Sequence, residues 1–254
     1  MGSAPLPSLD RVLPCGLFWL FAEKMTESEI KFEQFCNAHK IKFDKIDTGQ
    51  SPTPDYDIFV NSQKIVVEVK ELQANDEDKK ALQDIEIQKS AIWVIHRVGD
   101  KIRYKLGDAK RQLEGRAKGI CPSMLVLYDD RPFPVRGIFS YEILVAMYGW
   151  ETIDLHIPEK LGEPVTFGKH RFGKGKKFRK GVHTYISGLA ILSESTSDLL
   201  HLDIYLNDYA DKPLPYEMFL QIKDIDIYVR PQNHSNEFRK WIKVMRSSLT
   251  VGKK

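Results

Sequence analysis

Apolar and polar positions alternate in two neighbouring stretches of the chain. "TPDYDIFV" (Thr53–Val60) and "IVVEVKEL" (Ile65–Leu72) are rich in β-branched and aromatic residues, and their apolar positions recur at every second residue. This pattern predicts two β-strands. The polar stretch "NSQK" between them predicts a four-residue hairpin loop, which would place Val60 opposite Ile65.

The same patterning predicts the other elements. "TESEIKFEQFCNAHK" opens with a capping box, Thr26 followed three residues later by Glu29, and continues with an apolar stripe, so it predicts a helix. "IKFDKI" predicts a strand, and the nearly continuous apolar run "CPSMLVLYDD" predicts a strand at the centre of a sheet. Residues 74–90 are expected to form a solvent-exposed helix or a mobile excursion, and residues 106–119 a second helix. The order predicts an α/β fold with a mixed central sheet flanked by helices.

Beyond Arg131 the character of the chain changes. A helix is expected over residues 137–149, and "ISGLAILSE", "LLHLDIYLN" and "IKDIDIYVRP" are read as strands. There are no internal repeats and no long linker. We therefore expect residues 1–24 to be a poorly ordered N-terminal extension or a misassigned start, with a packed segment and then a signal peptide as the alternatives. A core is expected over residues 25–135, and a C-terminal elaboration with β-structure over residues 136–254.

Composition narrows the class of protein. The chain has 254 residues, of which 42% are hydrophobic and 29% charged, which suits a globular protein able to bury a core. The apolar run "RVLPCGLFWLFA" is too short to span a bilayer. The three cysteines of the chain are widely spread and have neither CxxC nor zinc-site spacing. These features predict a cytoplasmic protein with no membrane partner.

The hairpin places four charged side chains on one face. With Val60 opposite Ile65, Asp57 would face Glu68 and Asp55 would face Lys70. A register shifted by one residue would separate the carboxylates. Carboxylates this close repel each other unless a cation lies between them, and oxygen ligands suit Mg²⁺ or Mn²⁺ rather than zinc. A lysine beside such an ion can orient water and neutralise charge on a phosphate, so phosphodiester hydrolysis is indicated.

This arrangement resembles a known family. Pro54-Asp55, twelve intervening residues and Glu68-Val69-Lys70 are similar to the PD-(D/E)xK motif of restriction-endonuclease-like nucleases. The resemblance covers roughly residues 27–129 and implies a restriction-endonuclease-like core. Members of the family place an acidic residue on the helix ahead of the sheet, where Glu29 stands. A later helix often carries a polar residue facing the site, and Gln112 is the candidate.

The resemblance implies a metal-dependent nuclease, with a DNA endonuclease as the favoured activity. Asp55 and Glu68, helped by the carbonyl oxygen of Val69, would bind Mg²⁺ or Mn²⁺. Lys70 would align the attacking water, and Glu29 would bind a second ion or orient water. These are roles carried over from the family to the matching positions of this chain.

Structural roles remain open for several of these residues. Glu29 could serve only the capping box, although the two roles can coexist. Asp57 could be a strand-face carboxylate paired with a lysine, and it ranks below Asp55 as an accessory site residue. Glu68 and Lys70 could belong to the solvent face of an edge strand. Gln112 could be an ordinary surface residue of its helix.

A basic segment suggests the partner. "GKHRFGKGKKFRKG" (residues 168–181) contains no acid and has seven cationic residues: Lys169, Arg171, Lys174, Lys176, Lys177, Arg179 and Lys180. Such a segment suits a nucleic-acid backbone, and its two phenylalanines could either stack on bases or bury against the domain. A solvated loop is the competing interpretation. A second cluster over residues 101–118 could line the same groove.

The sequence leaves two further functional hypotheses open. One is a non-catalytic nucleic-acid-binding module on the same fold, in which the carboxylates serve structure. The other is an RNA-directed or DNA-repair nuclease that shares the site and differs in substrate. A homodimer is compatible with each of them.

Overall fold

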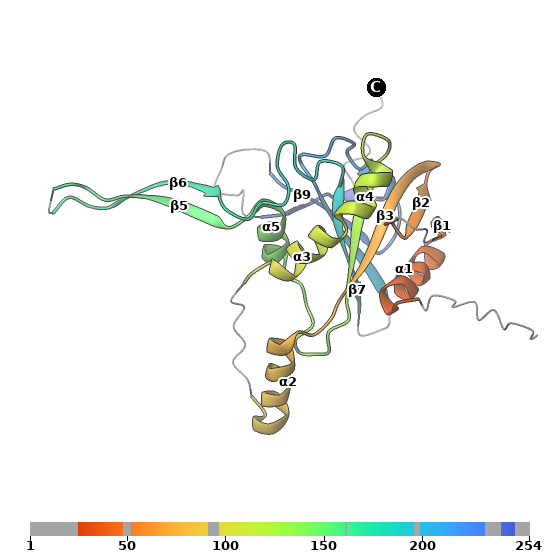
Figure 1. Ribbon diagram of the computed structural model, residues 1–254, viewed down its shortest axis with the longest axis horizontal. Coiled ribbons are helices and arrows are strands. Elements are labelled where there is room, and N and C mark those ends of the chain that lie inside the picture. Colours follow the sequence, from red (N-terminus) through yellow and green to blue (C-terminus); the bar gives the residue numbers. More distant parts are fainter. Residues whose placement is uncertain are drawn as a thin grey trace, which may run out of the picture.

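The computed structural model describes residues 25–47, 52–90, 97–160, 162–195, 199–231 and 240–246 (Figure 1). The expected N-terminal extension, residues 1–24, lies outside this part of the chain. Among the described residues, none of the helices has both the length and the apolar character needed to cross a bilayer.

A mixed sheet of eight strands forms the centre of the protein, in the order β1-β2-β3-β4-β7-β8-β9-β10. Pairs β3–β4, β4–β7 and β8–β9 are parallel and the others antiparallel. This confirms the predicted α/β class with a mixed sheet. The strands span Lys42–Lys45 (β1), Tyr56–Val60 (β2), Gln63–Leu72 (β3), Ser123–Asp129 (β4), Gly188–Glu194 (β7), Leu200–Leu206 (β8), Ile225–Val229 (β9) and Ile242–Lys243 (β10).

Helices pack against both faces of this sheet and define two cores. On one face, α1 (Glu27–Ala38) buries Phe32 and Phe35 against alternate residues of the strands, such as Val67. On the other, α3 (Asp100–Asp108), α4 (Lys110–Ala117) and α5 (Ser140–Tyr148) cover the opposite set, such as Val66. The strand β4 lies between the two cores and is buried along its whole length, as its apolar sequence predicted.

Helix boundaries differ from the prediction in one place. The single helix expected over residues 106–119 is wrong, because the structure has α3 and α4 joined at Ala109. Gly107 and Asp108 are weak helix formers, which favours a break there. The expected exposed helix over residues 74–90 is confirmed as α2 (Asp76–Gln88), which begins with a capping box from Asn75.

The β2–β3 hairpin turns more tightly than predicted. Asn61 and Ser62, with φ of 47° and 66°, make a two-residue turn of the kind whose twist matches that of the flanking strands. Ile58 therefore lies opposite Ile65, and the predicted pairing of Val60 with Ile65 is wrong by two residues. Because side chains alternate, a shift of two leaves every side chain on its predicted face.

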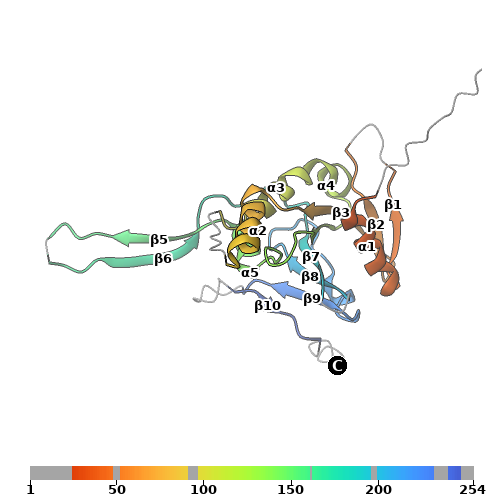
Figure 2. The ribbon, with the colours of Figure 1, turned by 90° about the horizontal axis from the view of Figure 1, so that it is seen from below.

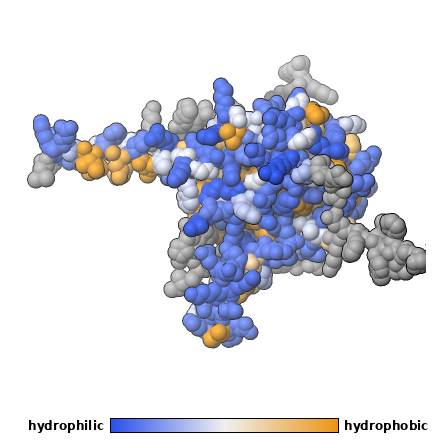
Figure 3. Space-filling model, viewed as in Figure 1, coloured by the Kyte–Doolittle hydropathy of each residue, from blue (hydrophilic) through white to orange (hydrophobic). Residues whose placement is uncertain are grey.

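A two-stranded ribbon, β5 (Glu151–His156) and β6 (Thr166–Phe172), stands outside the main sheet. It projects from the body of the protein as an arm in both views (Figures 1 and 2). Hydrophobic residues gather along one side of this arm (Figure 3). The competing interpretation of residues 168–181 as a solvated loop is wrong at its start, because β6 extends to Phe172.

Candidate functional site

The structure brings Asp55, Glu68 and Lys70 together across β2 and β3. Asp55 immediately precedes β2, and its Oδ2 accepts a hydrogen bond of 2.7 Å from the backbone N–H of Val69. The N–H and C=O groups of one strand residue point towards the same neighbouring strand. The Val69 carbonyl is therefore directed towards the Asp55 side of β3, as the predicted ligand set requires.

Glu68 is the most unusual residue of this group because it is a fully buried acid with 0% exposure. Within the described part of the chain, neither carboxylate oxygen has a hydrogen-bond partner of good geometry. Lys70 Nζ forms an ion pair with Oε1. Burial, and then the negative charge of Asp55, raises the pKa of Glu68 to about 7, although Lys70 and the backbone N–H of Asp55 oppose the shift.

Asp55 has the same electrostatic setting in weaker form. Burial raises the pKa of its carboxyl, while the hydrogen bond from Val69 N–H and the charge of Lys70 act in the opposite direction. The Glu29 carboxylate contributes to the raised pKa of Asp55, so α1 does bring an acid close to this site. Asp55 and Glu68 thus share Lys70 of β3, and Glu29 and Lys45 add a further acid and a further cation near Asp55.

Glu29 itself has structural partners. Its Oε2 accepts hydrogen bonds from Thr26 N at 2.8 Å and Thr26 Oγ1 at 2.9 Å, and Oε1 forms a 3.0 Å ion pair with Lys45. Burial alone would raise the pKa of Glu29, but the Thr26 hydrogen bonds and Lys45 outweigh it and lower the pKa. The capping-box role is confirmed, and it coexists with proximity to Asp55.

Asp57 is bound by two cations. Arg116 of α4 donates to it through Nε at 3.1 Å and through Nη2, and Lys64 Nζ lies 2.7 Å from Oδ2. Burial would raise the pKa of Asp57, but these partners lower it. The structural interpretation of Asp57 as a paired strand-face carboxylate therefore holds, with an arginine in addition to the lysine.

The position of Gln112 follows from its helix. It is half-buried on α4, one turn before Arg116, and therefore on the same side of the helix. Because α4 connects the parallel strands β3 and β4, it runs back along the sheet. Arg116 contacts Asp57, which lies opposite Val66 of β3. Gln112, one helical turn earlier, therefore lies closer to the end of β3 that carries Glu68.

The basic segment is partly structural. Phe172 and Phe178 are buried in the core beneath α3 and α5, which settles their role as packing residues. Arg171 pairs with Asp154 at 2.8 Å, and the side chain of Lys169 lies outside the described part of the structure. Lys176 and Lys177 line an open pocket of about 570 Å³ together with Arg103 of α3. Besides Arg171, the exposed members are Lys174, Lys176, Arg179 and Lys180.

The second basic cluster is largely neutralised within the fold. Lys101 pairs with Asp78, Arg103 with Asp100, Arg116 with Asp57 and Lys118 with Glu114. The first of these pairs joins α3 to α2 and the third joins α4 to the β2–β3 hairpin, whereas the other two are local to α3 and α4. Only the remaining cations of this cluster, Lys105, Lys110 and Arg111, stay as candidates for a nucleic-acid contact.

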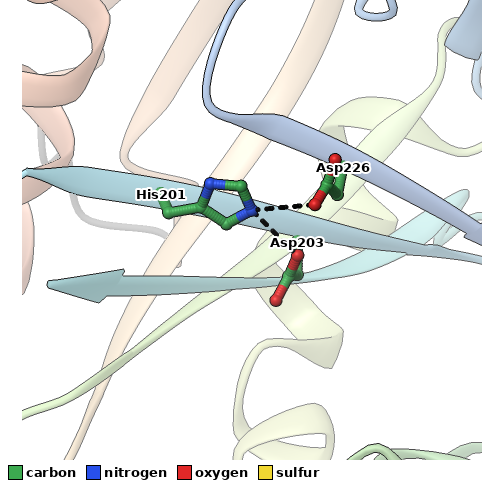
Figure 4. Close-up of side chains that lie close together, drawn as sticks. All are labelled: His201, Asp203 and Asp226. Atoms are coloured by element: carbon green, nitrogen blue, oxygen red, sulfur yellow. Dashed lines mark hydrogen bonds and ion pairs between the residues drawn. The ribbon is translucent and has the colours of Figure 1, made fainter. Parts of the chain in front are cut away.

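A separate cluster lies at the far side of the sheet, where His201 and Asp203 of β8 face Asp226 of β9 (Figure 4). His201 Nε2 is 3.1 Å from Asp203 Oδ1 and 3.3 Å from Asp226 Oδ2. Lys243 of β10 also lies 2.5 Å from that Asp226 oxygen. Lys243 offsets part of the charge of these two acids, and the hydrogen bond with Asp203, followed by the charges of the nearby acids, raises the pKa of His201.

The sequence prediction did not include this cluster. The alternation in "HLDIY" and "DIDIY" indicates which side chains share a face of each strand. The parallel pairing that aligns Asp203 with Asp226 depends on the tertiary fold. No family model, curated protein or solved structure matches this chain.

Proposed function

We propose that this protein is a metal-dependent phosphodiesterase acting on nucleic acid, and specifically a DNA endonuclease. The observation that carries the proposal is Glu68, a fully buried carboxylate beside Asp55 with a lysine two residues along the same strand. A buried acid whose oxygens lack good hydrogen-bond partners costs stability, and such costs concentrate at functional sites.

The donor set fits a hard divalent cation. Two carboxylates with raised pKa values, and a backbone carbonyl directed to the same side, are the oxygen ligands preferred by Mg²⁺ and Mn²⁺. Asp55, Glu68 and the Val69 carbonyl would hold the ion. When bound, such an ion lowers the pKa of a coordinated water and offsets charge on a phosphate.

The remaining groups have separate roles in this proposal. The ammonium of Lys70, held on the same face of β3, orients water and neutralises charge that builds up on the phosphate. The Glu29 carboxylate adds negative charge beside Asp55, which strengthens the local demand for a cation. The exposed cations Arg179 and Lys180 bind phosphates of the nucleic-acid backbone.

The order of elements supports this proposal. A helix, an antiparallel three-strand meander, helices and then a strand parallel to β3 surround the site. This is the mixed sheet that the order of elements in the sequence predicted. It does not distinguish DNA from RNA as substrate.

The direct test is a cleavage panel on single-stranded, duplex and branched DNA and on RNA, with Mg²⁺, with Mn²⁺ and with EDTA. We expect metal-dependent cleavage of DNA that is lost in Lys70→Ala and kept in Lys64→Ala. Lys64 is the matched control, because it lies on the same face of the same strand but pairs with Asp57. Cleavage unaffected by Lys70→Ala would contradict the proposed site.

One observation favours a non-catalytic nucleic-acid-binding module instead. The Lys70–Glu68 ion pair offsets part of the buried charge without any metal. In that case the protein would retain nucleic acid in a mobility-shift assay, cleave nothing with either metal, and bind equally well after Asp55→Asn or Glu68→Gln. The same panel therefore separates the two functions.

A further inference from the structure

The β5–β6 arm exposes a continuous apolar stripe. Leu155 lies directly opposite Phe167 in the ribbon, and Ile153 and Ile157 occupy alternate positions on β5 and just beyond it. Their exposed fractions are 56% for Leu155, 72% for Phe167, 42% for Ile153 and 77% for Ile157, and Val165 beside them is 48% exposed. An isolated two-stranded ribbon is marginally stable in water, and large exposed apolar surfaces mark interaction sites.

The other face of the arm is polar. Asp154 and His156 alternate with the apolar residues of β5, and Asp154 pairs with Arg171 of β6 at 2.8 Å. An arm that is polar on one face and apolar on the other presents a single sheet face for docking. The occupant therefore packs flat against one side of the ribbon.

The charges of the arm indicate what that occupant is. Its outer part, residues 153–167, has Asp154, Glu159 and Glu163 against a single Lys160, and is net acidic. The chain that returns from the arm, residues 168–181, contains seven cations and no acid. An acidic outer part repels phosphates, so a nucleic-acid groove is disfavoured as the occupant of the apolar stripe.

We infer that the arm pairs with the arm of a second copy of this chain, antiparallel and apolar face to apolar face. A twofold axis across the middle of the arms buries the Leu155 and Phe167 stripes against each other. It also places the acidic tip of each arm beside the basic root of its partner, where Lys174 and Lys176 lie. The surface is thus complementary to itself in both hydrophobicity and charge. This inference does not rest on the nuclease proposal.

The first experiment measures the mass of the full chain by sedimentation equilibrium across the micromolar range. We expect a dimer, and Phe167→Glu should raise its dissociation constant at least about a hundredfold, since it places a charge at the centre of the interface. Thr166→Glu is the matched control, because Thr166 is the exposed neighbour on the opposite face of the same strand. Unchanged far-ultraviolet circular dichroism spectra in both variants would show that the fold is intact.

The second experiment tests the antiparallel arrangement. Glu159→Lys/Glu163→Lys in one chain and Lys174→Glu/Lys176→Glu in another should each weaken self-association, because like charges then meet at both ends of the interface. Mixing the two variants should restore a heterodimer.

A monomer at all concentrations, a dimer insensitive to Phe167→Glu, or a mixture that fails to associate would each overturn the inference. A monomeric protein whose nucleic-acid affinity falls in Phe167→Glu would overturn it in favour of a nucleic-acid contact.

Discussion

Two acids on the same face of the β2–β3 hairpin, Asp57 and Glu68, lie in opposite electrostatic settings. Asp57 has Arg116 and Lys64 as partners, and its pKa is lowered. Glu68 shares Lys70 with Asp55, and its pKa is raised to about 7. Burial is the largest influence that raises the pKa of each acid, and the neighbouring charges decide the outcome. At Asp57 two cations outweigh burial, whereas at Glu68 the charge of Asp55 adds to it, and this separates a structural acid from a candidate ligand.

The largest expected effect of this contrast is on catalysis. Glu68→Gln should reduce metal-dependent cleavage by at least about a thousandfold, because it removes a charged ligand from the metal site. Asp57→Asn should leave the cleavage rate within a few-fold of the unmodified protein at temperatures where both are folded. Steady-state cleavage of duplex DNA measures both. Equal losses of cleavage rate in the two variants would contradict the distinction between Glu68 as a metal ligand and Asp57 as a structural acid.

Glu71→Gln provides the matched control for Glu68→Gln. Glu71 lies three residues further along β3, and alternation directs its side chain to the opposite face of the sheet. Its cleavage rate should therefore match that of the unmodified protein.

The two acids should also respond to pH in opposite directions. The folded pKa of Glu68, about 7, exceeds its ordinary value of 4.5, so the folded state binds more protons between these values. Its contribution to stability is present below pH 4.5 and is lost as pH rises through about 7. Asp57 has a lowered pKa, and its contribution is present above its ordinary value of 3.8 and lost on acidification.

Mg²⁺ should increase the difference between the pH dependences of the two acids, because only ionised Glu68 binds the ion. The affinity for Mg²⁺ should rise about tenfold per pH unit below pH 7 and level off above it. Added Mg²⁺ should raise the free energy of unfolding at pH 8 and have little effect at pH 5. Urea denaturation at both pH values, with and without Mg²⁺, measures this. An Mg²⁺ effect of equal size at both would argue against Glu68 as a ligand.

Without metal, substitutions at the two acids should change stability with opposite signs. At pH 8, Glu68→Gln should raise the free energy of unfolding by about 2 kcal/mol, because the buried charge is no longer present. Asp57→Asn should lower it by about 1–2 kcal/mol, a value discounted because Arg116 and Lys64 are 38% and 39% exposed. Urea denaturation in EDTA gives both values. Destabilisation by Glu68→Gln would show that this acid is structural.

The sequence predicted which face of the hairpin each site residue occupies, but not which residue lies opposite it. Alternation placed Asp55, Asp57, Glu68 and Lys70 on one side of the hairpin, and this survives the two-residue change in register. The register itself could not be predicted, because the left-handed conformations of Asn61 and Ser62 depend on how tightly the strands pair. Local pattern determines which face a side chain occupies, but the turn determines which residue it meets.

Contacts between residues far apart in the sequence could not be predicted either, because local patterns do not indicate which elements meet in the fold. Arg116 reaches Asp57 across 59 residues, so nothing local indicated that α4 neutralises this acid. The strands of the arm were not predicted either, because Gly168 and Gly173 gave β6 and its end the composition of a loop. The central strand β4, by contrast, was predicted correctly because its burial on both faces produces a continuous apolar run.

The smallest expected effect concerns the geometry of the contact between Arg116 and Asp57. Arg116 contacts Asp57 through Nε and Nη2, one nitrogen to each oxygen. Arg116→Lys keeps the positive charge but removes this two-point contact, so we expect the free energy of unfolding to fall by about 1 kcal/mol. Cleavage should not change, because Lys64 still lies beside Asp57 and the Glu68 site is untouched. A loss of cleavage in this variant would mean that Asp57 needs its arginine to keep it out of the metal site, which would join the two acids into one functional unit.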